Sequence, residues 1–295
     1  MDFKEITDYL DTRKDQIKEA TKTTYLNTFK NIVELFKLTK NDKSYNLTSK
    51  KIKQTLENQD KFNKIDILKV LILLKEFKKK PTKHLNSYRQ RLFNEKQIQS
   101  KQKMNDYLND GLNYDDLTTI LNKAYSEEKY IDFILFYLLI HINTRNTDLI
   151  ILNKNELSVK ELQDKYELEK DFNYFETKKD KIIYNRKQYK TKTKYGIKKD
   201  IITDERFITA LNTLDKDDFI FKNRVNKPYN RDEMNQFINA RFKKYNNKIK
   251  TINQQLIYKI VLKYYEDLND NEKVKQLRNR RGHSASIQET YYSSK

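Results

Sequence analysis

The 295 residues of this chain suffice for two compact domains, and 61 Lys and Arg against 42 Asp and Glu give it a formal charge of +19 at pH 7. Such an excess of positive charge favours a polyanionic partner, of which nucleic acid is the obvious kind. The complete absence of cysteine excludes disulfide bonds, thiolate zinc sites and cysteine nucleophiles.

The first hundred residues carry the periodicity of helices. Apolar side chains recur at helical spacing from Thr21 to Phe36. The apolar segment Ile65 to Phe77 predicts a second helix, and a longer amphipathic one from Leu85 to Ile98 follows Pro81. From Asn94 to Asp110 the sequence becomes polar and rich in Lys and Gln, as is typical where few contacts cross between domains.

We therefore predict a domain boundary that separates residues 1–105 from residues 106–295. Beyond it, a helical pattern resumes from Tyr114 to Tyr125, and the nearly all-apolar run from Tyr130 to Ile142 predicts a buried central helix. Asp132 interrupts this run, which is shorter than the roughly 18 apolar residues of a membrane span. We expect an intracellular protein without membrane contact, in the cytoplasm or in the nucleus or viral factory of a host.

The stretch from Asp180 to Thr203 has a different character. Ile182 to Tyr184 forms one short β-type run, Ile201 and Ile202 form another, and Gly196 lies in a Lys-rich turn between them. This pattern predicts a small β-hairpin.

Helical patterns return from Arg231 to Tyr265 and again from Lys273 to Arg281, with a break at Asn269 and Asp270. The sequence shows no internal repeat. The predicted fold class is mainly α with a small β-hairpin or sheet, in which a helical N-terminal domain precedes an α+β domain.

The C-terminal end carries a candidate nucleophile. Cleaving a DNA strand without a metal requires a nucleophile, cations on the two non-bridging phosphate oxygens and an acid for the leaving 5′-hydroxyl. The chain ends with Arg281-Gly282-His283-Ser284 and then Tyr291-Tyr292. This resembles the Gly-His-Ser box of the tyrosine recombinases, whose nucleophilic tyrosine lies nine residues after the box histidine, as Tyr292 lies after His283.

The resemblance implies a site-specific DNA recombinase or integrase in which Tyr292 forms a 3′-phosphotyrosyl link and His283 helps to hold the phosphate. It implies double-stranded DNA as the partner, assembly as a homo-tetramer on DNA, and no metal or ATP as cofactor. A phenol with a pKa near 10 needs nearby cations to act as a nucleophile. Tyr291 is the alternative nucleophile, and simple packing of two of the 21 tyrosines is the alternative to any catalytic role.

A second box lies upstream, where the apolar run ends at Asn143-Thr144 and leads into Arg145-Asn146-Thr147-Asp148-Leu149. It is similar to the first arginine box of the same family. The resemblance makes Arg145 the phosphate-binding arginine, since a guanidinium offers a planar fork that matches two phosphate oxygens. Asp148 takes the position of the acid that supports the fold. An ordinary ion pair between Arg145 and Asp148 is the alternative explanation.

The Lys-rich hairpin turn is similar to the family's hairpin that carries the general-acid lysine. We assign this role to Lys192, which would protonate the leaving hydroxyl, while the spacing to the Ile201-Ile202 strand allows Lys194 or Lys190 nearly as well. A solvated basic turn that contacts only the DNA backbone is the alternative, and it would still add a salt-dependent contribution to affinity.

The resemblance fails at the family's His-x-x-Arg box, which is expected upstream of His283. Residues 255–261 keep an apolar helix but offer Lys259, or Tyr258 in a shifted alignment, in place of the second arginine. Lysine neutralises a phosphate without gripping it through two parallel hydrogen bonds, so either the reaction is slow or another cation substitutes.

The other cations and histidines have simpler interpretations. We expect a solvated stripe that faces DNA, formed by Arg278, Arg280 and Arg281. His84 is predicted to lie on the surface, and His141 is predicted to be a buried helix residue and not a ligand.

Two rival functions stay open. A type IB topoisomerase shares the same chemistry, and a non-catalytic DNA-binding relic of a recombinase would explain the absent His-x-x-Arg box. The family's arrangement also implies that residues 1–105 form a core-binding-like DNA-binding domain and residues 106–295 the catalytic domain. The AT-rich type of composition, with 3 Gly, 2 Pro and no Trp, explains part of the basic charge and would suit a mobile element or a virus.

Overall fold

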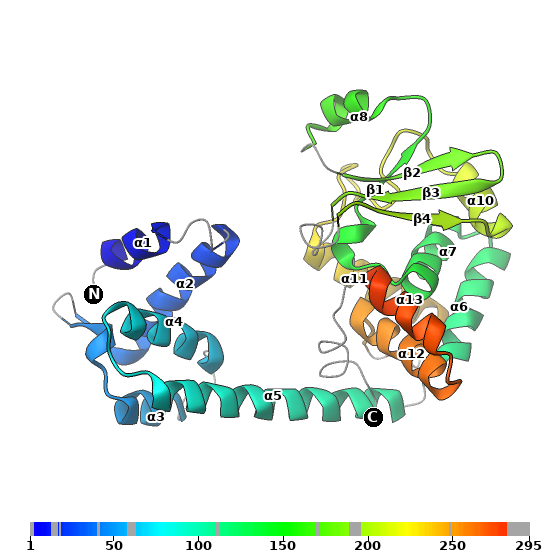
Figure 1. The fold of residues 1–295 in the computed structure, drawn as a ribbon. Coiled ribbons are helices and arrows are strands. Elements are labelled where there is room, and N and C mark those ends of the chain that lie inside the picture. The colour runs from blue at the N-terminus through cyan, green and yellow to red at the C-terminus, as the bar shows by residue number, and fades with distance from the viewer. Residues whose placement is uncertain are drawn as a thin grey trace. The chain divides into compact units, whose positions relative to one another are not determined.

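The computed structural model describes residues 3–12, 17, 19–39, 42–57, 63–109, 112–168, 172–188, 196–247, 249 and 251–281. The chain divides into two compact units, Met1–Gln102 and Lys103–Lys295. The described part is mainly helical with one small sheet of four strands, which confirms the predicted fold class (Figure 1). No helix in the described ranges is long and apolar enough to cross a membrane.

The first unit is all-helical in the ranges described. Its elements are α1 Phe3–Asp11, α2 Glu19–Phe36, a 3-10 turn Ser44–Asn46, α3 Ser49–Glu57, α4 Lys64–Phe77 and α5 Lys83–Asn109. The three helices predicted from periodicity are thus present as α2, α4 and α5, and α5 continues through the polar stretch in which the domain boundary is predicted.

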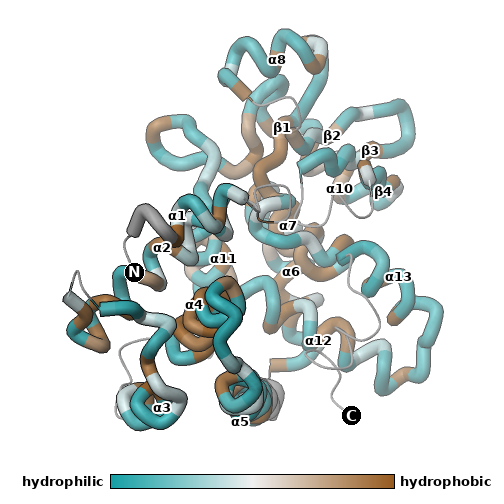
Figure 2. The backbone as a smooth tube through the Cα atoms, turned by 60° about the vertical axis from the view of Figure 1, so that its left-hand side comes forward, coloured by the Kyte–Doolittle hydropathy of each residue, from teal (hydrophilic) through white to brown (hydrophobic). Residues whose placement is uncertain are grey.

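The apolar helix α4 forms the centre of the first unit. Asn63 begins it by accepting a hydrogen bond from the Asp66 backbone N–H, as an N-cap residue does. Leu68, Leu71 and Leu74 of α4 are completely buried, and they share one hydrophobic core with side chains of α1, α2, α3 and α5. Figure 2 shows the largely hydrophobic character of α4 in brown, whereas α13 of the second unit is mostly hydrophilic and drawn in teal.

The second unit combines the sheet with helices. Its elements are α6 Tyr114–Ser126, α7 Tyr130–Tyr137, a π-helical turn Leu138–Ile142, a 3-10 turn Asn146–Leu149, β1 Ile151–Lys154, α8 Val159–Tyr166, β2 Asn173–Lys178, β3 Lys181–Arg186, β4 Lys198–Ile202, α10 Glu205–Asn212, α11 Arg231–Tyr245, α12 Gln254–Asp267 and α13 Asn271–Arg281. The predicted continuous helix from residue 231 to 265 is wrong, since the chain breaks between α11 and α12. Asn253 explains the new start, because its side chain accepts the N–H groups of Gln255 and Leu256.

The sheet has the order β1-β2-β3-β4, with β1 and β2 parallel and the other pairs antiparallel. Strands β3 and β4 are the predicted hairpin, in which Ile182 pairs with Ile202. Strands β1 and β2 are additional. Successive residues of each strand point to opposite faces, so Leu152 lies on the α8 side and Ile151 on the side of α7. Figure 1 shows α8 on one side of the sheet and α7, α12 and α13 on the other.

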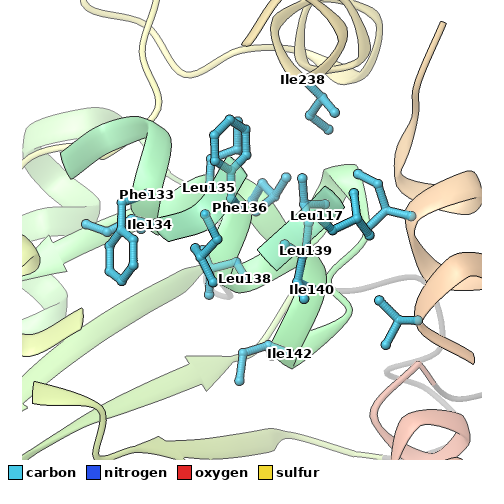
Figure 3. Packing of buried hydrophobic residues seen from close by; sticks show 14 of the residues in the cluster. Leu117, Phe133, Ile134, Leu135, Phe136, Leu138, Leu139, Ile140, Ile142 and Ile238 are labelled. Carbon is cyan, nitrogen blue, oxygen red and sulfur yellow. The ribbon is translucent and has the colours of Figure 1, made fainter. Parts of the chain in front are cut away.

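The predicted buried central helix is confirmed in the segment from residue 130 to residue 142. Figure 3 shows its side chains, among them Phe133, Phe136 and Leu139, packed in the core of the second unit, where all three are at most 1% exposed. The last turn widens into a π-helix in which the Thr144 N–H donates to the Leu138 carbonyl over 3.2 Å. Asn143 then reverses the chain with a φ of 58°, so the residue that follows Thr144 leaves the core.

Candidate functional site

Arg145 leaves the core directly after this turn and begins the short 3-10 turn that contains Asp148. Its backbone N–H donates to Asp148 Oδ2 over 3.1 Å, and its carbonyl accepts the Asp148 N–H over 2.9 Å. The Arg145 side chain is half-buried. Within the described ranges its guanidinium makes no hydrogen bond and no ion pair. Arg145 therefore has a fixed backbone and a cationic group that is available to an anion.

Asp148 is buried, at 3% exposure, and is neutralised by a second arginine that sequence analysis did not single out. Arg186 Nη1 lies 3.6 Å from Asp148 Oδ2, and Arg186 Nη2 lies 2.6 Å from Asp200 Oδ2. Burial raises the pKa of Asp148, and Arg186 acts against that rise. Tyr184 adds a hydrogen bond from its hydroxyl to the Asp148 carbonyl. Asp148 thus supports the turn, and its charge is balanced mainly by Arg186, with the charge of Arg145 acting in the same direction.

The pleat of the sheet places this cluster on the helical face. Ile182, Tyr184 and Arg186 are alternate residues of β3 and point the same way, as do Lys198 and Asp200 on β4. The register aligns the strands so that Arg186 pairs with Lys198 across the ladder. The hairpin therefore delivers its charged residues to the side on which α13 lies.

The C-terminal end of α13 is held by these hairpin cations. Arg186 Nη1 donates to the Arg280 carbonyl over 3.2 Å, and Lys198 Nζ donates to the Arg280 carbonyl over 3.1 Å and to the Asn279 carbonyl. Arg280 in turn donates to the His141 carbonyl over 2.8 Å, and its Nε lies 3.4 Å from Asp200 Oδ1. Cations at this end of a helix also interact favourably with its dipole.

Lys198 is another cation of this cluster that sequence analysis did not single out. Burial, and then the charge of Arg186, lower its pKa to about 8, and the charge of Arg145 acts in the same direction. The lysine is thus close enough to Arg145 for their charges to interact. The only signal in the sequence was its position between Gly196 and the predicted run of Ile201 and Ile202.

The predicted solvated stripe on α13 is wrong for two of its three members. Arg281 is only 3% exposed, stacks on the Tyr258 ring at 4.2 Å, and donates to Gln254 Oε1 over 2.7 Å and to the Gln254 carbonyl over 3.3 Å. Arg280 is engaged with Asp200 as described above. Arg280 anchors α13 to the π-helical turn and to the hairpin, and Arg281 anchors it to the start of α12. Their partners are protein groups distant in sequence.

Of the remaining predicted site residues, only Lys259 lies in a part of the chain that the structure describes. Lys259 lies on α12 and is 9% exposed. The other predicted site residues lie outside the described part of the chain: Lys190, Lys192, Lys194, His283, Tyr291 and Tyr292. Their roles stay predictions. The structure does bring the Arg145 turn, the hairpin and Arg280, two residues before Gly282, into one cluster.

The two described histidines differ in their surroundings. His84 is exposed, as predicted. His141 lies in the π-helical turn, and burial lowers its pKa to about 4, which keeps the imidazole neutral at pH 7. Within the described ranges no three His, Asp or Glu side chains are grouped so that they could hold a metal ion.

Comparison with known proteins gives no family assignment. No protein-family model matches the sequence, and no curated protein matches it. Among solved structures, the crystal structure of XerA recombinase matches 99% of this chain and 93% of its own chain, with 12% identity and a TM-score of 0.40. A likeness of that size assigns no role to any residue of this chain.

Proposed function

We propose that this chain is a site-specific DNA recombinase of the tyrosine type, which cleaves and rejoins DNA strands through a covalent link to Tyr292. The observation that carries the proposal is the cluster around Arg145. There a half-buried guanidinium without a partner in the described ranges lies in the same cluster as the end of α13, from which the His283 box continues.

The arrangement suits a phosphodiester better than a carboxylate or a neutral ligand. Arg186 and Arg280 together balance the charges of the two acids of the cluster, Asp148 and Asp200, so these acids repel an approaching anion less. Arg145 and Lys198 both add positive charge there. A preorganised cationic site of this kind stabilises the extra negative charge of a pentavalent phosphate.

In the proposed reaction the phenolic oxygen of Tyr292 gives its proton to a water molecule and attacks the phosphorus. The bond from phosphorus to the 5′-oxygen breaks, Lys192 gives that oxygen a proton, and a 3′-phosphotyrosyl link remains. Arg145, His283 and Lys259 hold the phosphate. Attack by another strand's 5′-hydroxyl reverses these steps and rejoins the DNA, and the covalent link conserves the bond energy so that no ATP is required.

The family resemblance extends the proposal to assembly. The unit Met1–Gln102 would bind DNA beside the catalytic unit, and four copies would act together on two DNA sites. A topoisomerase of type IB would use the same residues as a monomer. Relaxation of supercoiled plasmid by dilute protein, without paired DNA sites, distinguishes that alternative.

One observation favours a non-catalytic DNA-binding protein as the second candidate. In α12, where the second phosphate-binding arginine is expected, the candidate cation Lys259 is 9% exposed. A buried lysine reaches a phosphate less readily than an arginine at the surface of a cleft. This candidate predicts binding to DNA without any covalent adduct.

Trapping the covalent intermediate tests the proposal. Duplexes that the protein selects from a randomised pool are rebuilt with a nick near each phosphate, so that a short cleaved product diffuses away and the adduct accumulates. We expect an adduct that is lost in Tyr292→Phe and retained in Tyr291→Phe, with the modified residue mapped by mass spectrometry. Binding without an adduct on any selected duplex would support the non-catalytic candidate, and an adduct at another residue would exclude Tyr292 as the nucleophile.

A further inference from the structure

A polar pocket of about 380 Å³ lies in the second unit between the Arg145 turn, α11 and the start of α12. Seven of its ten lining residues are Asn or Gln, one is Arg231 and none is acidic. A second pocket of this unit, of about 270 Å³ beside His141, includes Asp204 in its lining. Of these two pockets, the amide-lined one has no carboxylate in its lining that would repel an anion.

The hydrogen bonds around Asn146 fix the orientation of the amides on the α11 side. Asn146 Nδ2 donates to the Arg231 carbonyl over 3.1 Å and to Asn235 Oδ1 over 2.7 Å. A carbonyl only accepts, so Asn146 must present its NH₂ group there, and Asn235 must answer with its oxygen. Asn239 Oδ1 accepts the Ile252 N–H over 3.0 Å. The NH₂ groups of Asn235 and Asn239 are thus left as donors.

At the start of α12, too, amide oxygens of the pocket are used by the protein itself. Asn253 Oδ1 is used to cap the helix, and Gln254 Oε1 accepts the buried guanidinium of Arg281 over 2.7 Å. Gln236 and Gln255 are exposed, and neither side chain has a hydrogen-bond partner in the described ranges. Four amide oxygens are therefore taken by the protein itself, and the pocket offers mainly N–H donors.

An excess of donors over acceptors favours an oxyanion over a nucleobase edge. A base edge such as that of adenine needs a donor and an acceptor side by side, whereas a phosphate only accepts. Arg231 and the N-terminal end of α12, with its positive dipole, also favour negative charge. The buried oxygen of Asn146 has no partner in the described ranges, so a bridging water fits between it and the bound group.

We infer that this pocket binds a second phosphodiester of the nucleic acid strand, next to the phosphate at Arg145. Asn146 connects the two sites, because it follows Arg145 in the chain and lines the pocket. Arg281 acts as a positioning residue that orients Gln254 from behind. The inference rests on the proposed function only in taking DNA as the ligand, and it does not depend on cleavage.

Substitutions that add a charge without changing the side-chain shape test this second phosphodiester site. Fluorescence anisotropy with a selected duplex, at several salt concentrations, measures the DNA affinity of each variant. Gln236→Glu and Gln255→Glu place a carboxylate in the pocket without removing a hydrogen bond. Asn212→Asp is the matched control, since Asn212 is exposed on α10, lies outside the pocket lining, and accepts from Lys216, which a carboxylate retains. We expect the pocket variants to weaken binding about tenfold and to lower the salt slope by about one unit, the amount for one lost phosphate contact. The control should change both quantities much less.

Neutral methylphosphonates, placed at one phosphate at a time, locate the contact. A methylphosphonate at one position should weaken DNA binding by the wild type. The same methylphosphonate should have little further effect on DNA binding by Gln236→Glu. Equal weakening by the control and the pocket variants would overturn the inference, as would altered base preference with an unchanged methylphosphonate profile.

Inorganic phosphate distinguishes the source of the group. If it raises the Tm of the wild type but not of Gln236→Glu, and DNA affinity is equal in both, the site binds free phosphate and the inference is wrong. Failure of the wild type to bind any DNA would refute the proposed function as well. DNA binding with adduct formation, and pocket variants that match the control, would refute the pocket alone.

Discussion

The two units of this chain have interiors of different kinds. In the described ranges, the buried polar or charged residues of the first unit are Thr28, Ser44 and Lys75. The second unit buries many more, including Asp132, Asp148, Arg186, Asp200 and Arg281. Apolar burial stabilises a fold wherever side chains are of suitable size, whereas buried charges require partners at fixed positions. The second unit therefore holds particular segments in place, as a site that acts on a charged backbone requires.

Removing Arg186 should have the largest effect on stability. Arg186→Ala leaves Asp148 and Asp200 buried without their common partner, and breaking a buried ion pair in this way costs about 3–5 kcal/mol. Hydrogen exchange of the β3 and β4 amides measures the loss within the second unit. The control is Arg206→Ala, because the ion pair between Arg206 and Asp204 is more exposed to solvent. Its loss should lower the free energy of unfolding by at most about 1 kcal/mol. Similar losses in both variants would mean that the buried cluster is no more important than a surface pair.

A substitution in α4 makes the corresponding test of the first unit. Leu71 is completely buried, so Leu71→Ala should lower the free energy of unfolding by about 3 kcal/mol through lost transfer energy and a cavity. Leu73→Ala, at a half-buried position of the same helix, should cost clearly less. Urea unfolding followed by amide exchange in α4 measures both. Equal effects would indicate that the first unit does not depend on a tightly packed core.

The contrast between the interiors also explains what the sequence could predict. The run from Tyr130 to Ile142 and the helix from Ile65 to Phe77 were predictable, because a predominantly apolar pattern leaves few alternatives to burial. The hairpin was predictable from two Ile runs around Gly196. Strand β1 was not, because it has only four residues and its burial depends on β2 and α8, which contact it only in the folded chain.

The buried arginines were the least predictable feature of the candidate site. Arg281 and Arg280 look like solvated charges, since neighbouring residues of α13 are polar, and only the fold brings them to Gln254 and Asp200. Arg186 gave no signal for the same reason. Arg145 was recognisable because its motif is local: an apolar helix, a turn and an acid three residues later.

The buried histidine of the second unit gives a pH test. Burial lowers the pKa of His141 to about 4, so the folded chain keeps it neutral while the unfolded chain takes up a proton below about pH 6.5. Acidification from pH 6.5 to pH 4 should therefore remove stability, by up to about 3 kcal/mol. Urea unfolding at pH 7 and pH 4.5 should show a smaller loss in His141→Gln than in the wild type. His84→Gln changes an exposed histidine of the first unit and should leave the loss unaltered.

Arg145 should show the smallest effect on stability and the clearest one on function. Its guanidinium has no partner in the described ranges, so Arg145→Ala should change the free energy of unfolding by no more than about 0.5 kcal/mol. The same substitution removes a preorganised cation from the proposed phosphate site, and adduct formation should fall by about 10²- to 10³-fold. Amide exchange and the trapping assay, applied side by side to Arg145→Ala and Arg186→Ala, separate the two kinds of arginine. A loss of stability in Arg145→Ala as large as that in Arg186→Ala would place Arg145 among the structural cations, and it would remove the main support for a phosphate site at this turn.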